Sequence, residues 1–122
     1  MSKYTELSDF EINKKVASHY LPCDYNLNEH AKTVELIGFL GDTDEYNVYG
    51  TFDPCNNPAD AMPIIIENKI CTAFDVFAEE HDGGNWVASP AYGFASERTR
   101  NNNLYRAAME LFLLLKDAEN EG

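Results

Sequence analysis

Apolar residues recur at helical spacing in three parts of the chain. The first predicted helix covers residues 9–18 and opens with a capping box, in which Ser8 and Glu11 bond to each other's backbone N–H groups. The last predicted helix begins near Leu104 and is so rich in leucine, alanine and phenylalanine that little of it can face water. Its polar end, residues 117–122, is expected to fray.

The middle helix has two possible starting points. Asn57 can cap a helix whose first residue is Pro58 and which runs to about Asn68. Pro63 would then lie inside the helix and kink it. Alternatively, Asp60 is the cap and the helix starts later. The residue pattern does not decide between the two.

Runs rich in β-branched and aromatic residues predict two hairpins. An acidic turn separates the strands of the first hairpin, and a turn with two glycines separates those of the second. The four predicted strands are 33–40, 46–52, 70–78 and 86–89. Residues 90–103 are predicted as a loop, with one further short strand at 91–94.

This order of elements predicts an α/β (α+β) domain. A small, largely antiparallel sheet with three helices packed on it forms a layered sandwich. The chain of 122 residues has no internal repeat and no linker, so residues 1–122 are expected to form a single domain.

Three cysteines, Cys23, Cys55 and Cys71, are odd in number and lack a pairing motif. They indicate free thiols in a reducing compartment, where cysteine serves as a small core residue. The first residues lack the apolar segment of a signal peptide, and no run is long enough to cross a membrane. A cytoplasmic location is therefore expected.

The formal net charge is −12, which opposes direct binding to nucleic acid and to anionic membranes. Between residues 33 and 97 there are twelve acidic side chains and one basic one, Lys69. Then Arg98, Arg100 and Arg106 follow with no acid between them. The segment 98–106 is therefore one local basic region in a chain whose net charge repels anions.

The three arginines form the first candidate site. A guanidinium matches the geometry of phosphate or carboxylate, and the start of the last helix adds N–H donors. Arg98, Arg100 and Arg106 are therefore candidate contacts for a small anionic ligand. The plainer interpretation is that Arg98 and Arg100 are solvated loop charges and that Arg106 pairs with a nearby acid.

The turn before the middle helix forms the second candidate site. Asn56, Asn57 and Asp60 can present amide and carboxylate groups to a base edge or a sugar hydroxyl. Trp86 and Tyr49 can stack on a planar ring. The plainer interpretation assigns the first three to capping and turn formation, and Trp86 to the core.

Motifs for catalysis are missing from the sequence. There is no phosphate-binding loop, no dinucleotide fingerprint, no nucleophile elbow and no paired cysteine motif. The three histidines, His19, His30 and His81, are scattered without ligand spacing. We therefore expect a binding protein with no enzymatic activity, no cofactor and no metal.

Three blocks of the sequence strongly resemble the NinX family, whose members are small proteins of lambdoid tailed phages. They are Ser8-Asp9-Phe10-Glu11-Ile12-Asn13-Lys14; Asp53-Pro54-Cys55-Asn56-Asn57-Pro58-Ala59-Asp60-Ala61 with Pro63-Ile64-Ile65; and Trp86 with Arg106-Ala107-Ala108-Met109. Met62 and the stretch 101–104 depart from the family pattern. The resemblance implies a phage origin, the cytoplasm of the infected bacterial host and an α-β-α sandwich. It implies no particular activity.

Two functional hypotheses follow. The first is a non-catalytic binder of a small anionic, nucleotide-like ligand, which sequesters a host defence signal. The alternative is an acidic mimic of DNA that inhibits a host nucleic-acid-binding protein. The mimic requires one exposed face to carry the acids Asp42, Asp44, Glu45, Glu79, Glu80 and Asp82. A homo-oligomer is expected if the sheet leaves part of the last helix uncovered.

Overall fold

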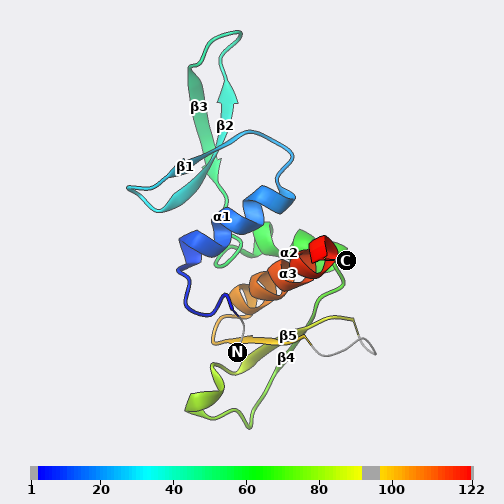
Figure 1. Cartoon of the computed structure of the whole chain (residues 1–122). Helices are drawn as coiled ribbons and strands as arrows, with labels where there is room; N and C mark the ends of the chain where they lie inside the picture. The colour runs from blue at the N-terminus through cyan, green and yellow to red at the C-terminus, as the bar shows by residue number, and fades with distance from the viewer. Residues whose placement is uncertain (1–2, 92–96, 122) are drawn as a thin grey trace.

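The computed structural model describes residues 3–91 and 97–121, and in it a layer of helices separates two small sheets (Figure 1). The helices are α1 (Asp9–Tyr20), α2 (Pro58–Glu67) and α3 (Leu104–Glu121), with a short 3-10 helix, η1 (Glu80–Asp82). The strands are β1 (Tyr25–Asn28), β2 (Thr33–Phe39), β3 (Tyr46–Thr51), β4 (Cys71–Phe74), β5 (Trp86–Ser89) and β6 (Thr99–Asn101).

Each sheet has three antiparallel strands in sequence order. Sheet A contains β1, β2 and β3, with an irregularity in register between Leu36 and Ile37. Sheet B contains β4, β5 and β6. The predicted α+β class and the antiparallel pairing are confirmed. The predicted sheet is divided in two among the described residues, and the helices lie between the halves rather than outside them.

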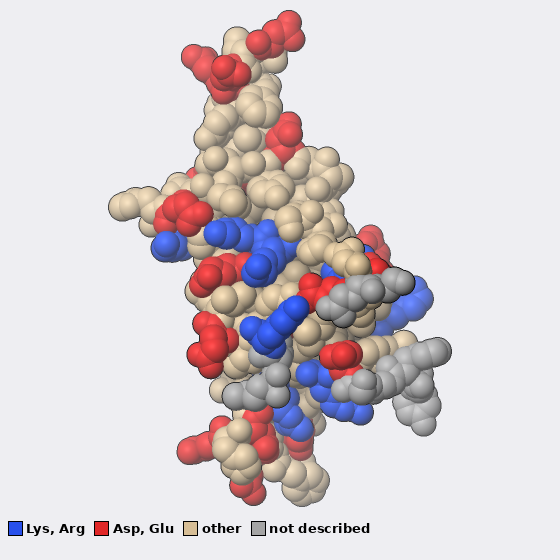
Figure 2. Space-filling model, viewed as in Figure 1, with Lys and Arg blue, Asp and Glu red and all other residues tan. Residues whose placement is uncertain are grey.

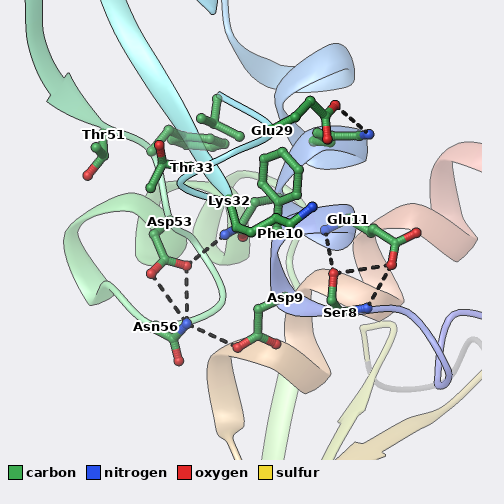
Figure 3. A pocket seen from close by; sticks show the side chains of 14 residues that line it. Ser8, Asp9, Phe10, Glu11, Glu29, Lys32, Thr33, Thr51, Asp53 and Asn56 are labelled. Carbon is green, nitrogen blue, oxygen red and sulfur yellow. Dashed lines mark hydrogen bonds and ion pairs between the residues drawn. The ribbon is translucent and has the colours of Figure 1, made fainter. Parts of the chain in front are cut away.

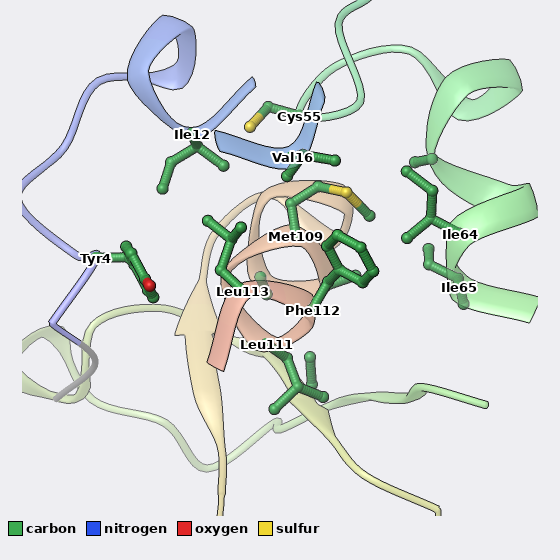
Figure 4. Packing of buried hydrophobic residues seen from close by; sticks show 14 of the residues in the cluster. Tyr4, Ile12, Val16, Cys55, Ile64, Ile65, Met109, Leu111, Phe112 and Leu113 are labelled. Atoms are coloured by element: carbon green, nitrogen blue, oxygen red, sulfur yellow. The ribbon is translucent and has the colours of Figure 1, made fainter. Parts of the chain in front are cut away.

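Helix α3 forms the centre of the molecule, and its composition explains this layering. It packs against α1 and α2 and also against β5 and β6. Every residue from Arg106 to Leu113 is buried, and Figure 4 shows Met109, Leu111 and Phe112 among the core side chains. A helix that is apolar on most sides needs neighbours on most sides. A homo-oligomer was expected if part of α3 were uncovered. Because α3 is covered within one chain, a homo-oligomer would have to form through another surface.

The capping box predicted for α1 is present. The Ser8 hydroxyl accepts from the Glu11 N–H at 3.2 Å, and the Glu11 carboxylate accepts from the Ser8 N–H at 3.3 Å. The Ser8 hydroxyl also lies 3.2 Å from the Glu11 carboxylate and donates to it, and the two bonds from Ser8 to this carboxylate lower the pKa of Glu11. The buried face of α1 carries Ile12, Val16 and Ala17 into the core.

The first of the two possible starts of α2 is correct. Asn57 caps the helix by accepting from the Ala59 N–H at 3.0 Å, and Pro58 is the first helical residue. Pro63 lies inside the helix. The buried residues Ala61, Ile64 and Ile65 hold α2 against the core on the side facing α3.

Several expectations differ from the structure. Strands β1 and β6 were not predicted, because each is too short to show an alternating pattern. The predicted strand at 91–94 falls mostly outside the described residues, and Ala91 lies in a bend. The polar end of the last helix remains helical as far as Glu121. Of the cysteines only Cys55 is buried, so a core role is wrong for Cys23 and Cys71.

No helix among residues 3–91 and 97–121 is long and apolar enough to cross a membrane.

Candidate ligand-binding site

A pocket of about 720 Å³ opens between α1 and sheet A (Figure 3). It is lined by the first turns of α1, the β1–β2 turn, the start of β2, the end of β3 and the turn at residues 53–56. Pockets that hold small organic ligands typically measure about 300–1,000 Å³. The pocket therefore has room for a molecule the size of a nucleotide.

Two lysines provide the positive charge of the pocket. Both ammonium groups lie over the ring of Phe10, with Lys14 at 5.2 Å and Lys32 at 5.7 Å from its centre. Lys14 also makes a weak ion pair with Glu29 at 3.4 Å. No ion pair of Lys32 is found in the described part of the chain. Lys32 is exposed and has a left-handed backbone with φ of 59°.

Asp53 and Asn56 form the polar end of the pocket. Asp53 accepts from the Asn13 side chain at 2.7 Å and from Asn56 at 3.2 Å. The Asp53 N–H donates to the Asp60 carboxylate at 2.9 Å, which fixes the turn against the start of α2. Asp53 is half-buried and Asn56 is exposed, so both can meet a ligand in the pocket.

Asp9 joins this polar end to the interior of the protein. One of its oxygens accepts from Arg106 at 2.7 Å, and the other accepts from Asn56 at 3.1 Å. Figure 3 shows Asp9, Asp53 and Asn56 close together. Because Arg106 neutralises Asp9, the carboxylates of the pocket repel an anion less than their number suggests.

Arg106 itself is buried and bonds only within the protein. Its Nε donates to Glu110 at 2.8 Å, and its Nη2 donates to the carbonyl oxygens of Tyr4 and Leu7 at 3.1 and 2.7 Å. Burial acts to lower the pKa of Arg106, but the bonds to Asp9 and Glu110 outweigh it and raise the pKa. The guanidinium is a charged cross-link between α3 and the segment before α1.

The structure brings Arg106 close to the predicted turn residues, but these residues do not line one common pocket. Asn56 meets Arg106 through Asp9, as described above. Asn57 caps α2, and Asp60 accepts from the Asp53 N–H. Among these residues only Asn56 lines the pocket. Asn57 and Asp60 therefore shape the turn but do not line the pocket.

The other predicted site residues lie elsewhere. Arg98 is exposed before β6, and Arg100 in β6 pairs with Asp75 at 3.0 Å. Trp86 in β5 packs edge-on against Phe74 with ring centres 5.2 Å apart. Tyr49 is exposed on β3, and its hydroxyl lies 4.0 Å from the Cys23 sulfur. None of these four lines the pocket.

Asn56 is the one lining residue that was predicted as a ligand contact, and the lining residues that were not include Asp9, Phe10, Asn13, Lys14, Lys32 and Asp53. Most of them belong to two blocks, 8–14 and 53–61, that carry the resemblance to the NinX family. Their position in these family blocks was the signal by which the sequence could have identified them. Charge counting overlooked Lys14 and Lys32 because each follows an acid, Glu11 or Glu29, by three residues in the sequence.

The Cys55 thiol belongs to the turn at residues 53–56 beside the pocket. Burial raises the pKa of the Cys55 thiol, and the nearby carboxylates raise it further, so Cys55 stays protonated and unreactive. No cluster of three or more histidine, cysteine or acidic side chains suited to a metal occurs among the described residues. The pocket presents ammonium, amide and carboxylate groups at fixed positions, which suits recognition of a polar molecule.

A family model described as "Bacteriophage P22, NinX" matches residues 3–116. The match covers all of the pocket and nearly the whole chain. No match was found among curated proteins or among solved structures.

Proposed function

The chain belongs to the bacteriophage P22 NinX family, and for this phage protein we propose a role as a non-catalytic binder of a small anionic, nucleotide-like ligand. The observation that carries the proposal is the pocket beside α1, in which two lysines converge on Phe10 near the Asp53–Asn56 turn. Sequestration of a host defence signal is the function that such binding serves in a phage.

The chemistry of the ligand follows from the two ends of the pocket. A phosphate or carboxylate suits the ammonium groups of Lys14 and Lys32, which are strong donors to such groups. A sugar hydroxyl or an amino group suits Asp53, which accepts hydrogen bonds, and Asn56, which both donates and accepts. A nucleotide carries both kinds of group on one small body.

In this proposal the arginines have a different role from the one that the sequence indicated. Arg106 holds Asp9, and Asp9 positions the side chain of Asn56. Arg106 is thus a positioning residue, and Lys14 and Lys32 take its place as the contacts for the anion. The ion pair of Arg100 with Asp75 places that arginine at sheet B, on the other side of α3 from the pocket.

The alternative of a DNA mimic receives less support from the arrangement of charges. The acids Asp42, Asp44 and Glu45 lie at the tip of the β2–β3 hairpin, whereas Glu79, Glu80 and Asp82 lie around η1. These two groups occupy opposite ends of the molecule, and lysines and arginines lie between them in the view of Figure 2. A continuous acidic face of the kind that a mimic requires is not formed by these six residues.

Isothermal titration calorimetry against a panel of mononucleotides and cyclic dinucleotides tests the proposal. Nucleosides and inorganic phosphate serve as the comparison probes. We expect at least one nucleotide to bind more tightly than either part alone. Lys32→Gln should weaken that binding about tenfold or more, since a hydrogen bond to a charged group contributes about 1.5–3 kcal/mol.

Lys69→Gln is the matched control. Lys69 is also exposed and also has a left-handed backbone, with φ of 54°, but it does not line the pocket. It should leave the affinity unchanged. If no nucleotide binds, or if both lysine variants weaken binding equally, the pocket is not the site.

A further inference from the structure

We propose that strand β4 is a self-association edge, which pairs in antiparallel orientation with β4 of a second copy of this chain. Sheet B has the order β4-β5-β6, so β4 has one neighbouring strand in the described structure. All four of its residues, Cys71 to Phe74, are exposed. This surface lies across the helix layer from the pocket, so the proposal stands apart from ligand binding.

Among the described residues, no backbone partner reaches the outer side of β4. The Asp75 N–H donates to the Asn85 carbonyl at 2.7 Å, in register with the β4–β5 pairing. Residues of an antiparallel strand alternate between facing the partner strand and facing away from it. Thr72 and Phe74 therefore direct their N–H and C=O groups outward, where no backbone bond from another described segment reaches them.

Among the described residues, strand β4 has one of the features that normally protect an edge, its short length of four residues, and lacks several others. Natural edge strands are blunted by shortness, lysine, proline, a bulge or a covering loop. The segment Cys-Thr-Ala-Phe contains no charge and no proline, and its pairing with β5 is regular. Such an edge is a template for another strand.

Exposed apolar side chains occur at the end of β4 and in the turn that follows it. Phe74 is 53% exposed, Val76 is 69% exposed and Phe77 is 87% exposed. Large apolar side chains that gather on a surface mark an interaction site, whereas scattered ones do not. Their burial would add to the backbone hydrogen bonds of a new strand pair.

The charges flanking β4 favour a second copy as the partner. Lys69 precedes the strand, is exposed, and has no ion pair in the described part of the chain. Glu79 and Glu80 follow it and are also exposed. Antiparallel pairing of two copies brings the lysine end of each strand to the acidic end of the other, whereas parallel pairing brings like charges together. A twofold axis makes both contacts at once.

Sedimentation equilibrium over a wide range of protein concentration tests the proposal. We expect a reversible monomer–dimer equilibrium. Phe77→Lys should weaken the dimer at least tenfold, because it removes apolar surface and places a lysine near the partner's lysine end. Thr72→Pro should also weaken the dimer, because it removes an outward N–H without removing a bond to β5.

Tyr49→Lys is the control, since it makes a similar change at another exposed aromatic residue, in β3. It should leave the dimer constant unchanged, and circular dichroism should show that all three variants fold as the parent does. A chain that stays monomeric at every concentration overturns the proposal. A dimer that is weakened by Tyr49→Lys but not by Phe77→Lys also overturns it.

Discussion

At the scale of single residues, Arg106 connects parts of the chain that the sequence keeps far apart. Its guanidinium bonds to Asp9, to Glu110 and to two carbonyl groups of the N-terminal segment. Arg106 is 6% exposed and Glu110 is fully buried. A charge pair in such a place is stable only while both partners remain.

We expect Arg106→Met to lower the free energy of unfolding by about 3–5 kcal/mol, because the Glu110 carboxylate would stay buried without the guanidinium. Urea denaturation measures this effect. The double variant Arg106→Met with Glu110→Leu should recover part of the loss.

Arg98→Met, at an exposed position, should change the free energy by less than about 0.5 kcal/mol. If the single and double variants at Arg106 unfold alike, the charge of Glu110 is not the cause of the loss.

At the scale of elements, Asn103 joins the start of α3 to the turn beside the pocket. Its side-chain oxygen accepts from the Tyr105 N–H at 2.9 Å, which caps the helix. Its side-chain nitrogen donates to the Cys55 carbonyl at 2.8 Å and to Asn56 at 3.1 Å. The Asn103 amide therefore caps α3 and also ties it to the turn at Cys55 and Asn56, whereas the Asn57 side chain only caps α2.

Asn103→Ala should therefore cost more stability than Asn57→Ala. Loss of an N-cap costs about 1 kcal/mol, and loss of the bond to a buried carbonyl adds about 1 kcal/mol or more. Asn103→Asp separates the two contributions, since it keeps the cap and removes the donor. Chemical denaturation of the three variants measures them, and equal losses for both alanine variants would show that the link to Cys55 contributes nothing.

The elements also show where pattern reasoning works. The capping box of α1 was predictable because caps depend on neighbours within a few residues. The start of α2 at Asn57–Pro58 was one of two alternatives that the sequence left open, and the structure decided between them. Strands β1 and β6 were not, because strands of four and three residues are held by pairing with distant segments rather than by their own sequence. The position of helix α3 was predictable, but its burial on two sides depends on the packing of α1 and α2 on one side and of β5 and β6 on the other.

At the scale of the whole molecule, a clasp joins the two ends of the chain. The Tyr4 hydroxyl donates to the Asp117 carboxylate, and Lys3 pairs with the same carboxylate at 2.8 Å. Burial, together with the bond to Asp117, raises the pKa of Tyr4 to about 12 from an ordinary value of 10.0. The clasp holds the polar end of α3, which the sequence predicted to fray.

This shift predicts a loss of stability in alkali. Because the unfolded chain releases the Tyr4 proton near pH 10 and the folded chain releases it only near pH 12, the free energy of unfolding falls as the pH rises between these values. Tyr4→Phe should flatten that decline, as measured by denaturation at a series of pH values. Tyr46→Phe, at an exposed position, should reproduce the parent profile. An unchanged profile for Tyr4→Phe would exclude the clasp as the source.

The candidate site shows the limits of the sequence most clearly. Asn56 was predicted as a ligand contact because the residue types of the segment around it are those of a rigid turn. Lys14 and Lys32 were not, since nothing local shows that the two lysines meet over one aromatic ring. Arg106 was prominent in the charge pattern, but an arginine that binds a ligand and one that binds its own protein look the same in a sequence.

The sequence by itself determined the positions of the helices, the cap of α1, the two hairpins and the acidic balance, because these depend on residues close together along the chain. It also carried the resemblance that places the protein in a phage family. Only the tertiary structure decided that the helices lie between two sheets, that Arg106 is buried, and that Lys14 and Lys32 line one pocket together with Asp53 and Asn56. Those features depend on contacts between segments dozens of residues apart, and packing of the whole chain around α3 sets them.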